Sequence, residues 1–131
     1  MKKLSAISTT TLNKMVEMMV DGYIKINTGN SFMPVSVEAI FDNEKYLIVS
    51  VAHYYEQNSD LMADPEMLFI YVKAMNTYIP SYFKQDGFMG SEQESVIIEN
   101  GEITGYRAKL QAEHNAFANT WLRNIKQQQN L

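Results

Sequence analysis

Hydrophobic positions near the N-terminus recur at the spacing of an α-helix. They repeat every three or four residues, at Leu12, Met15, Val16, Met19 and Val20. This spacing forms one apolar stripe on a helix. The hydroxyls of residues 8–11 can cap the first turn, and Gly22 can end the helix because glycine adopts the left-handed conformation without steric cost. We therefore predict an N-terminal helix that begins near these hydroxyls and ends before Gly22.

Further along the chain, apolar and polar positions alternate, which is typical of half-buried β-strands. We predict strands over residues 23–26, 33–41, 46–55, 68–72 and 77–83. Turns are expected at residues 28–30 and 42–44, and the second turn joins its two strands into a hairpin. Pro80 predicts that its strand lies at a sheet edge, because proline cannot donate a ladder hydrogen bond.

Two polar stretches interrupt the strands, and we expect residues 57–64 and 84–93 to form loops. Between these loops, Asp64-Pro65-Glu66 admits two interpretations. Asp64 can cap a helix that has Pro65 in its first turn, or the segment can precede a strand. We favour the strand, because residues 68–72 are rich in aromatic and β-branched side chains.

The last third of the chain carries two local signals. Residues 96–99 and 102–106 flank Asn100-Gly101, a pair that tolerates the positive φ needed at both centres of a type I′ hairpin turn. A helix over residues 108–126 is then predicted by apolar positions at steps of three or four: Leu110, His114, Phe117, Trp121 and Ile125. His114 lies on this stripe, so we assign it to the core.

The order of these elements predicts an α+β fold, an antiparallel sheet of about five or six strands with an N-terminal and a C-terminal helix packed on it. The chain has 131 residues, of which 46% are hydrophobic, and this length suits one domain with its own core. We therefore predict a single domain over residues 1–131, with flexible ends at residues 1–7 and 127–131.

Composition and charge narrow the function classes. The chain has no cysteine, which excludes disulfides and thiolate chemistry and suits a reducing cytoplasm. No apolar run approaches the length of a membrane span, and polar residues interrupt any N-terminal export signal. The net charge of −4 argues against a nucleic-acid partner, which needs clustered Lys and Arg. We expect a cytoplasmic protein with neither a membrane nor a nucleic acid as its partner.

The candidate chemistry is concentrated in residues 50–69, which read SVAHYYEQNSDLMADPEMLF. Residues 46–72 contain no Lys or Arg, and six of the eight tyrosines lie between residues 46 and 82. Acidic residues interleaved with aromatic side chains fit a protein partner or a basic ligand. We expect a binding surface formed by His53, Tyr54, Tyr55, Gln57, Asp60, Asp64 and Glu66.

These residues also have structural interpretations. His53 can converge with Tyr55 and Gln57 on a ligand, or it can cap the core by hydrogen bonding to a loop carbonyl or to Asp60. The carboxylates can serve acid/base chemistry or hold a cation, whereas Asp60 and Asp64 can equally stabilise turns. Their spacing matches no metal loop, so we expect no metal ion, no cofactor and no catalytic residue.

The same stretch resembles a signature of a family of small bacterial domains of unknown function, found largely on conjugative elements and phages of gut bacteria and Firmicutes. Members carry a sequence close to SVAHYYEQNGDLMRDPEM, where this chain has SVAHYYEQNSDLMADPEM. Ser59 stands where glycine is usual, and Ala63 stands where a basic residue is common. Phe32-Met33-Pro34 is similar to the family's F-M-P before its first paired strand. The resemblance covers about residues 22–83 and implies a mobile-element accessory protein, without implying an activity.

Three functions fit these observations. The first is a non-catalytic binding or accessory protein of a bacterial mobile element or phage, for example an anti-defence factor. The second is a small hydrolase-like enzyme that uses His53 with Asp60 or Asp64, which requires these groups to converge in a concave pocket. The third is a structural subunit that self-associates through its edge strand and methionines. We favour the first function with a protein partner, and a homo-oligomer is compatible with it.

Overall fold

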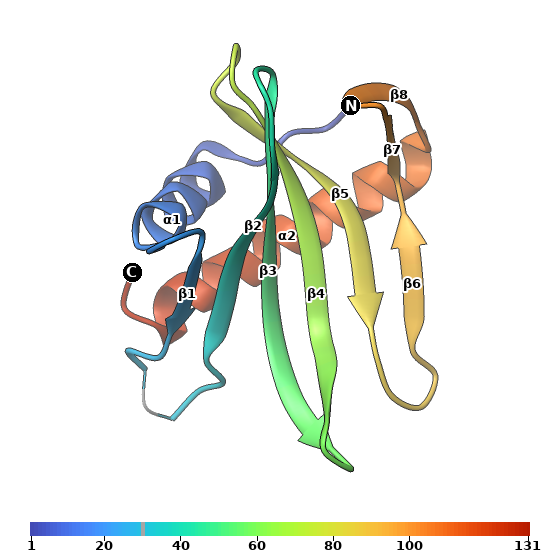
Figure 1. Ribbon diagram of the computed structural model, residues 1–131. Coiled ribbons are helices and arrows are strands. Elements are labelled where there is room, and N and C mark those ends of the chain that lie inside the picture. Colours follow the sequence, from blue (N-terminus) through green and yellow to red (C-terminus); the bar gives the residue numbers. More distant parts are fainter. Residues whose placement is uncertain (30) are drawn as a thin grey trace.

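The structure is a computed structural model that describes residues 1–29 and 31–131 (Figure 1). In chain order its elements are α1 (Ala6–Glu17), β1 (Tyr23–Ile26), β2 (Val35–Asp42), β3 (Tyr46–Gln57), β4 (Asp60–Val72), β5 (Thr77–Gln85), β6 (Ser91–Glu94), β7 (Val96–Glu99), β8 (Glu102–Tyr106) and α2 (Ala108–Gln128). The α+β fold predicted from the sequence is confirmed. Neither helix in the described ranges is long and apolar enough to cross a membrane.

Six strands form one antiparallel sheet in which neighbours in sequence are neighbours in space, in the order β1-β2-β3-β4-β5-β6. The remaining two strands, β7 and β8, pair only with each other. The predicted hairpin of residues 96–106 is confirmed, and both central residues of its turn have positive φ, 51° at Asn100 and 77° at Gly101. Short connections join β2 to β3, β3 to β4, β4 to β5 and β5 to β6, because antiparallel neighbours need no crossover.

Both helices pack on the same face of the sheet (Figure 1). The predicted helix stripes are confirmed in part: Leu12, Met15, His114, Trp121 and Ile125 are buried, whereas Val20 lies beyond the end of α1 and is 71% exposed, and Phe117 is 41% exposed. The predicted alternation along β2 holds as far as Ala39 and is lost at Phe41, where the register with β3 shifts and the side chain is 37% exposed. The main core is built from these side chains: Leu12, Met15, Val35, Val37, Val49, Val51, Met67, Phe69, Tyr78, Ala118, Leu122 and Ile125. Burial of this apolar set against two helices explains why one face of β2, β3 and β4 is continuously hydrophobic.

The β7–β8 hairpin covers one half of the opposite face. Ile48, Ile70, Ile79 and Val96 form a second, smaller core there. The tip of the hairpin is tied to the β2–β3 turn, where the Asn43 side-chain amide donates to the Gly101 carbonyl at 3.1 Å. The half of this face nearer the β3–β4 turn has no element over it in the described part of the chain.

The N-terminal helix begins earlier than the sequence predicts. Its N-cap is Ser5, whose hydroxyl accepts from the Ser8 amide at 3.2 Å, and it ends at Glu17. The predicted capping hydroxyls of residues 8–11 lie inside the helix instead. Thr10 and Thr11 donate to the carbonyls four residues back, at 3.0 and 3.1 Å. This local bonding lets threonine occupy a helix interior, and the pattern alone does not distinguish it from capping.

The strands are longer than predicted around both expected loops. Residues 57–64 are not a loop, because β4 begins at Asp60 after a two-residue turn. The strand favoured over a helix at Asp64-Pro65-Glu66 is confirmed, but the segment lies inside β4 rather than before it. Residues 84–93 are likewise not one loop, because they contain the end of β5 and most of β6. Consequently β5 is not an edge strand, and Pro80 lies in the part of β5 beyond its pairing with β6.

Two glutamines bind distant segments of the chain: Gln111, which lies in α2, and Gln129, which is the C-cap of α2. Gln111 accepts from the Lys2 amide at 2.7 Å and donates to the Lys2 carbonyl at 2.7 Å. Gln129 is fully buried, and its side chain accepts from the amides of Thr28 and Gly29 and donates to the Met33 carbonyl. The C-terminal helix is confirmed, although it ends at Gln128 rather than at residue 126.

These contacts hold segments that the sequence predicts to be flexible. Leu4 is 4% exposed, and its amide donates to the Tyr78 carbonyl at 3.0 Å. Flexibility of residues 1–7 and 127–131 stays a prediction, although these contacts oppose it. The predicted turn at residues 28–30 includes Asn30, which lies outside the described residues.

The Gln129 contacts predict a stability effect. Gln129→Ala leaves the amides of Thr28 and Gly29 and the Met33 carbonyl without their partner, so we expect the free energy of unfolding to fall by about 2–3 kcal/mol. Urea denaturation measures this difference. The matched control is Gln127→Ala, whose side chain is exposed and which should change stability by less than about 0.5 kcal/mol. Equal effects of the two variants would contradict the anchoring role.

The β3–β4 turn predicts a stabilising substitution. Ser59 has φ of 72°, in the left-handed region that favours glycine. Removing the side chain relieves about 1–2 kcal/mol, and the extra freedom of glycine in the unfolded chain takes back about 0.5–1 kcal/mol. We expect Ser59→Gly to raise the free energy of unfolding by about 0.5–1 kcal/mol, measured by thermal and urea denaturation. A destabilised Ser59→Gly variant would show that the turn conformation is different.

Candidate functional site

The uncovered half of the outer sheet face, called the open face below, is assembled by the strand register. Residues paired across antiparallel strands point to the same face. One row across the sheet consists of Tyr23, Glu38, Ser50, Leu68 and Tyr82. The next row consists of Lys25, Ser36, Ala52, Glu66 and Lys84. The open face is therefore polar and aromatic, in contrast with the helix-covered face.

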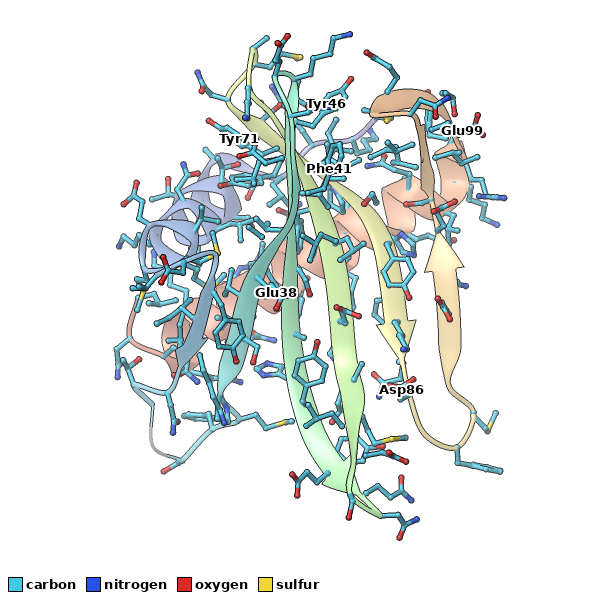
Figure 2. The ribbon with its side chains drawn as sticks, in the orientation of Figure 1. Glu38, Phe41, Tyr46, Tyr71, Asp86 and Glu99 are labelled. Atoms are coloured by element: carbon cyan, nitrogen blue, oxygen red, sulfur yellow. The ribbon has the colours of Figure 1, made fainter. Side chains whose placement is uncertain are left out.

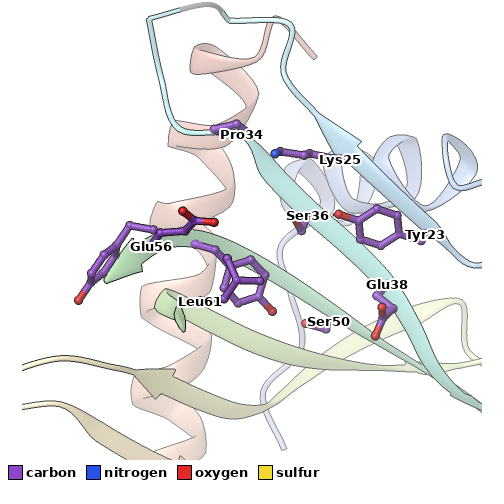
Figure 3. A pocket seen from close by; sticks show the side chains of 10 residues that line it. Tyr23, Lys25, Pro34, Ser36, Glu38, Ser50, Glu56 and Leu61 are labelled. Carbon is purple, nitrogen blue, oxygen red and sulfur yellow. Dashed lines mark hydrogen bonds between the residues drawn. The ribbon is translucent and has the colours of Figure 1, made fainter. Parts of the chain in front are cut away.

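A groove of about 660 Å³ lies on the open face over β1 to β4 (Figure 3). Its lining residues are Tyr23, Lys25, Pro34, Ser36, Glu38, Ser50, Tyr54, Tyr55, Glu56 and Leu61. Figure 3 shows Tyr23 and Glu38 on one side, Glu56 and Leu61 on the other, and Ser50 between them. The hollow exists because short serine side chains occupy its centre and long side chains its walls. Its volume falls within the range of small-ligand pockets.

Carboxylates dominate the electrostatics of this groove. Glu38 and Glu56 line it, and Glu66 lies next to it, where its Oε2 accepts from the Ser50 hydroxyl at 2.7 Å and the Tyr54 hydroxyl at 3.5 Å. Across the described ranges, the ion pairs involve Lys45, Lys73 and Lys84, and none of these lysines pairs with the three groove glutamates. Lys25 is the cation among the lining residues. The groove is therefore a site of negative charge.

The groove environment shifts the pKa of the Tyr54 phenol. Partial burial raises its pKa above the ordinary value, and the nearby carboxylates of Glu66 and Glu38 raise the pKa further. Both effects disfavour the phenolate, since burial penalises charge and like charges repel. Tyr54 is therefore a neutral hydrogen-bond donor at physiological pH, and its hydroxyl donates to the Glu66 carboxylate.

His53 lies on the other side of the sheet from the groove floor. Its ring is 5.6 Å from the Trp121 ring in an edge-on arrangement under the helices, and its Nδ1 is 3.0 Å from the Pro34 carbonyl oxygen. A carbonyl only accepts hydrogen bonds, so Nδ1 carries a proton. The structure thus places His53 in the core-capping position, bonded to a loop carbonyl. Its indirect connection to the groove is through Pro34, which lines the groove.

The other predicted site residues are dispersed. Asp64 accepts from the Gln85 side chain at 2.7 Å, away from the groove. Gln57 and Asp60 pair at the exposed tip of the β3–β4 hairpin. Tyr55 borders the groove, but its hydroxyl lies beside Gly87 of the β5–β6 turn, where an added Cβ would approach it to 2.9 Å. Figure 2 shows that turn, marked by Asp86, on the far side of β4 from Glu38.

Of the seven predicted residues, the structure therefore brings together Tyr54 and Glu66 with Tyr55 at the groove border. It adds residues that the sequence analysis did not include in the binding surface, chiefly Tyr23, Glu38 and Glu56. Their alternation along the strands was visible in the sequence. The cross-strand register that makes them neighbours was not.

His114 is buried, as predicted. Its Nδ1 lies 2.8 Å from the Ser95 hydroxyl, and its ring stacks on Phe83. Burial lowers the pKa of the His114 imidazole, against a smaller opposing effect of Glu113, so the ring is neutral at physiological pH. Within residues 1–29 and 31–131, no group of three or more His, Asp or Glu side chains is placed to hold a metal ion.

The electrostatics of the groove predict a titration shift. Glu66→Gln removes one of the charges that raise the Tyr54 pKa, so this pKa should fall, while burial keeps it above the ordinary value of about 10. Carbon-13 NMR of labelled tyrosine, with Tyr54→Phe to assign the signal, measures it. The control Glu99→Gln, on the β7–β8 hairpin, should leave the Tyr54 pKa unchanged. An unchanged pKa in Glu66→Gln would show that the two groups do not interact.

Comparison with known proteins places the chain in a family. A family model for a domain of unknown function, DUF6908, matches residues 5–131. The match includes both helices, which lie outside the stretch that carries the resemblance noted from the sequence. No curated protein and no solved structure matches the chain significantly. The protein therefore belongs to the DUF6908 family of domains of unknown function.

Proposed function

We propose that this protein is a non-catalytic binding protein that holds a segment of a partner protein in the groove of the open face. The observation that carries this proposal is the groove itself, a concave, tyrosine-walled surface that neither the helices nor the β7–β8 hairpin covers. Tyrosine supplies rigid contact area with a polar tip and is enriched in protein interfaces. A covered sheet face would serve only stability, whereas this one stays accessible.

The hydrolase-like alternative has less support. It needs His53 close to Asp60 or Asp64, but His53 contacts Trp121, Asp64 is bonded to Gln85, and Asp60 is at the exposed hairpin tip. In the described part of the chain, the Ser50 hydroxyl donates to Glu66 and makes no hydrogen bond to a histidine. A nucleophile, a base and an orienting group within hydrogen-bond reach are the usual requirements for hydrolysis. The groove supplies binding groups rather than this arrangement.

Self-association through an edge strand also has less support. The strand expected at the edge, β5, is paired on both sides along part of its length. The edge strands of the sheet are β1 and β6, and β6, on the side of β5, carries Glu92 and Glu94. Two copies of β6 pairing edge to edge would bring these carboxylates together. Like charges close together across strands are destabilising, and charged edges hinder such pairing.

The resemblance noted from the sequence adds a setting to the proposal. In this setting the protein acts in the bacterial cytoplasm as an accessory factor of a mobile element or phage, and anti-defence is one form of such a role. The partner is then a protein of the host or of the element itself. Binding through the groove is independent of this setting and is tested separately.

A substitution that fills the groove tests the proposal. Ser36 lies in the groove centre and outside the main core, so Ser36→Trp should block the groove and leave the fold intact. The matched control is Ser91→Trp, on the exposed strand β6. Peptides selected from a random display library on the wild type should bind Ser91→Trp equally and Ser36→Trp at least about tenfold more weakly, with folding of each variant checked by amide NMR.

Two results would contradict the proposal. A selection that enriches no peptide would contradict the proposal that the protein binds a polypeptide segment. Peptides that bind the wild type and Ser36→Trp with equal affinity would place the binding surface elsewhere.

A further inference from the structure

The groove glutamates restrict what can cover them. Glu38 stands opposite Ser50 in the strand register, and Ser50 donates to Glu66, so the two carboxylates flank one serine. Both hydrogen bonds to Glu66 reach Oε2, and its Oε1 receives none from the part of the chain that the structure describes. A neutral segment laid over these groups would strip their water without replacing it, which is costly for charged groups. A ligand with hydrogen-bond donors and positive charge avoids this cost.

The tyrosines indicate which kind of positively charged group fits the groove. Tyr54 donates to Glu66, so its ring stands beside the carboxylate, and Tyr23 is 45% exposed on the opposite wall. A guanidinium group can fork onto a carboxylate and lie flat on an aromatic ring at the same time. An ammonium group forms a point contact and is more strongly hydrated. The combination of carboxylates with phenol rings therefore fits arginine better than lysine.

The dimensions and the rim of the groove favour a polypeptide. The groove crosses four strands, from Tyr23 on β1 to Leu61 on β4. Three inter-strand spacings amount to about 14 Å, which an extended chain covers with about four residues. Leu61 is 66% exposed at the far wall. A small polyamine would neutralise the glutamates but leave this leucine in water, whereas a peptide can cover both.

From these features we infer that the groove takes an extended polypeptide segment in which an arginine is flanked by apolar residues. The guanidinium pairs with Glu66 and Glu38 beside Tyr54, and a flanking apolar side chain contacts Leu61. This inference rests on the proposed function, because it names the ligand class of the same groove.

The test uses the library-selected peptides and asks what their affinity depends on. Arginine should be enriched among them, and replacing it with citrulline, which keeps the shape and removes the charge, should weaken binding at least about tenfold. Glu38→Gln and Glu66→Gln should each weaken binding of the arginine peptide and have little effect on the citrulline peptide. Glu99→Gln, on the β7–β8 hairpin, should leave both affinities unchanged. Fluorescence anisotropy with labelled peptides measures all of these values.

The rim contact is tested separately. Leu61→Ser should weaken the arginine peptide several-fold, whereas the control Met75→Ser, at an equally exposed apolar position in the β4–β5 turn, should not. Spermine serves as the small-cation probe and should bind more weakly than the peptide. Spermine that matches the peptide in affinity, together with no effect of Leu61→Ser, would overturn the polypeptide occupant.

The outcomes separate this inference from the function beneath it. Selected peptides without a cation, or equal affinity of arginine and citrulline peptides, would overturn the inferred ligand class. If Ser36→Trp still weakens those peptides, the binding function of the groove stands. If Ser36→Trp has no effect on them, both the function and the ligand class are wrong.

Discussion

The structure depends on one irregularity in the register between β3 and β4. Ala52 pairs with Glu66 and Tyr54 pairs with Ala63, so two residues of β4, Asp64 and Pro65, lie opposite His53 alone. An extra residue on one strand reverses which face its later side chains occupy. Between this irregularity and the β3–β4 turn, the odd-numbered residues of β4, Leu61 and Ala63, therefore lie on the open face.

This reversal decides the composition of the groove. Without it, Asp64 would share the open face with Glu66, and Leu61 would point toward the helices. With it, Asp64 turns to Gln85 on β5, and Leu61 joins its register partner Glu56 in one wall of the groove. The irregularity therefore spreads the acidic residues of the central stretch over two surfaces and leaves an apolar contact at the end of an acidic groove.

Local patterns predicted most of the fold. Both helices, the β2–β3 hairpin and the Asn100-Gly101 turn follow from spacing and turn chemistry within a few residues. Errors arose where a second local solution existed. Threonine hydroxyls satisfied by helix carbonyls resemble caps, and Asn58-Ser59 forms a tight turn without the expected glycine. The edge assigned to β5 failed because one proline constrains only its own position.

The candidate site was less predictable for a physical reason. The residues that form it come from β1 to β4 and become neighbours only through pairing across strands, which no single stretch encodes. The prediction that His53, Tyr54 and the following acids gather at one place rested on their closeness in sequence, although His53 and Tyr54 are consecutive on β3 and therefore point to opposite faces. Tyr54 and Glu66 share the open face, whereas Asp64 lies at the irregularity and accepts from Gln85, and His53 faces the core.

Measuring the register between β3 and β4 tests most directly whether the irregularity shapes the groove. Nuclear Overhauser contacts between backbone protons of facing residues identify which residues pair in an antiparallel ladder. The account predicts contacts between Ala52 and Glu66 and between Tyr54 and Ala63. A continuous ladder that places Tyr54 opposite Asp64 would contradict it, because Leu61 would then leave the groove and the acidic residues would return to one face.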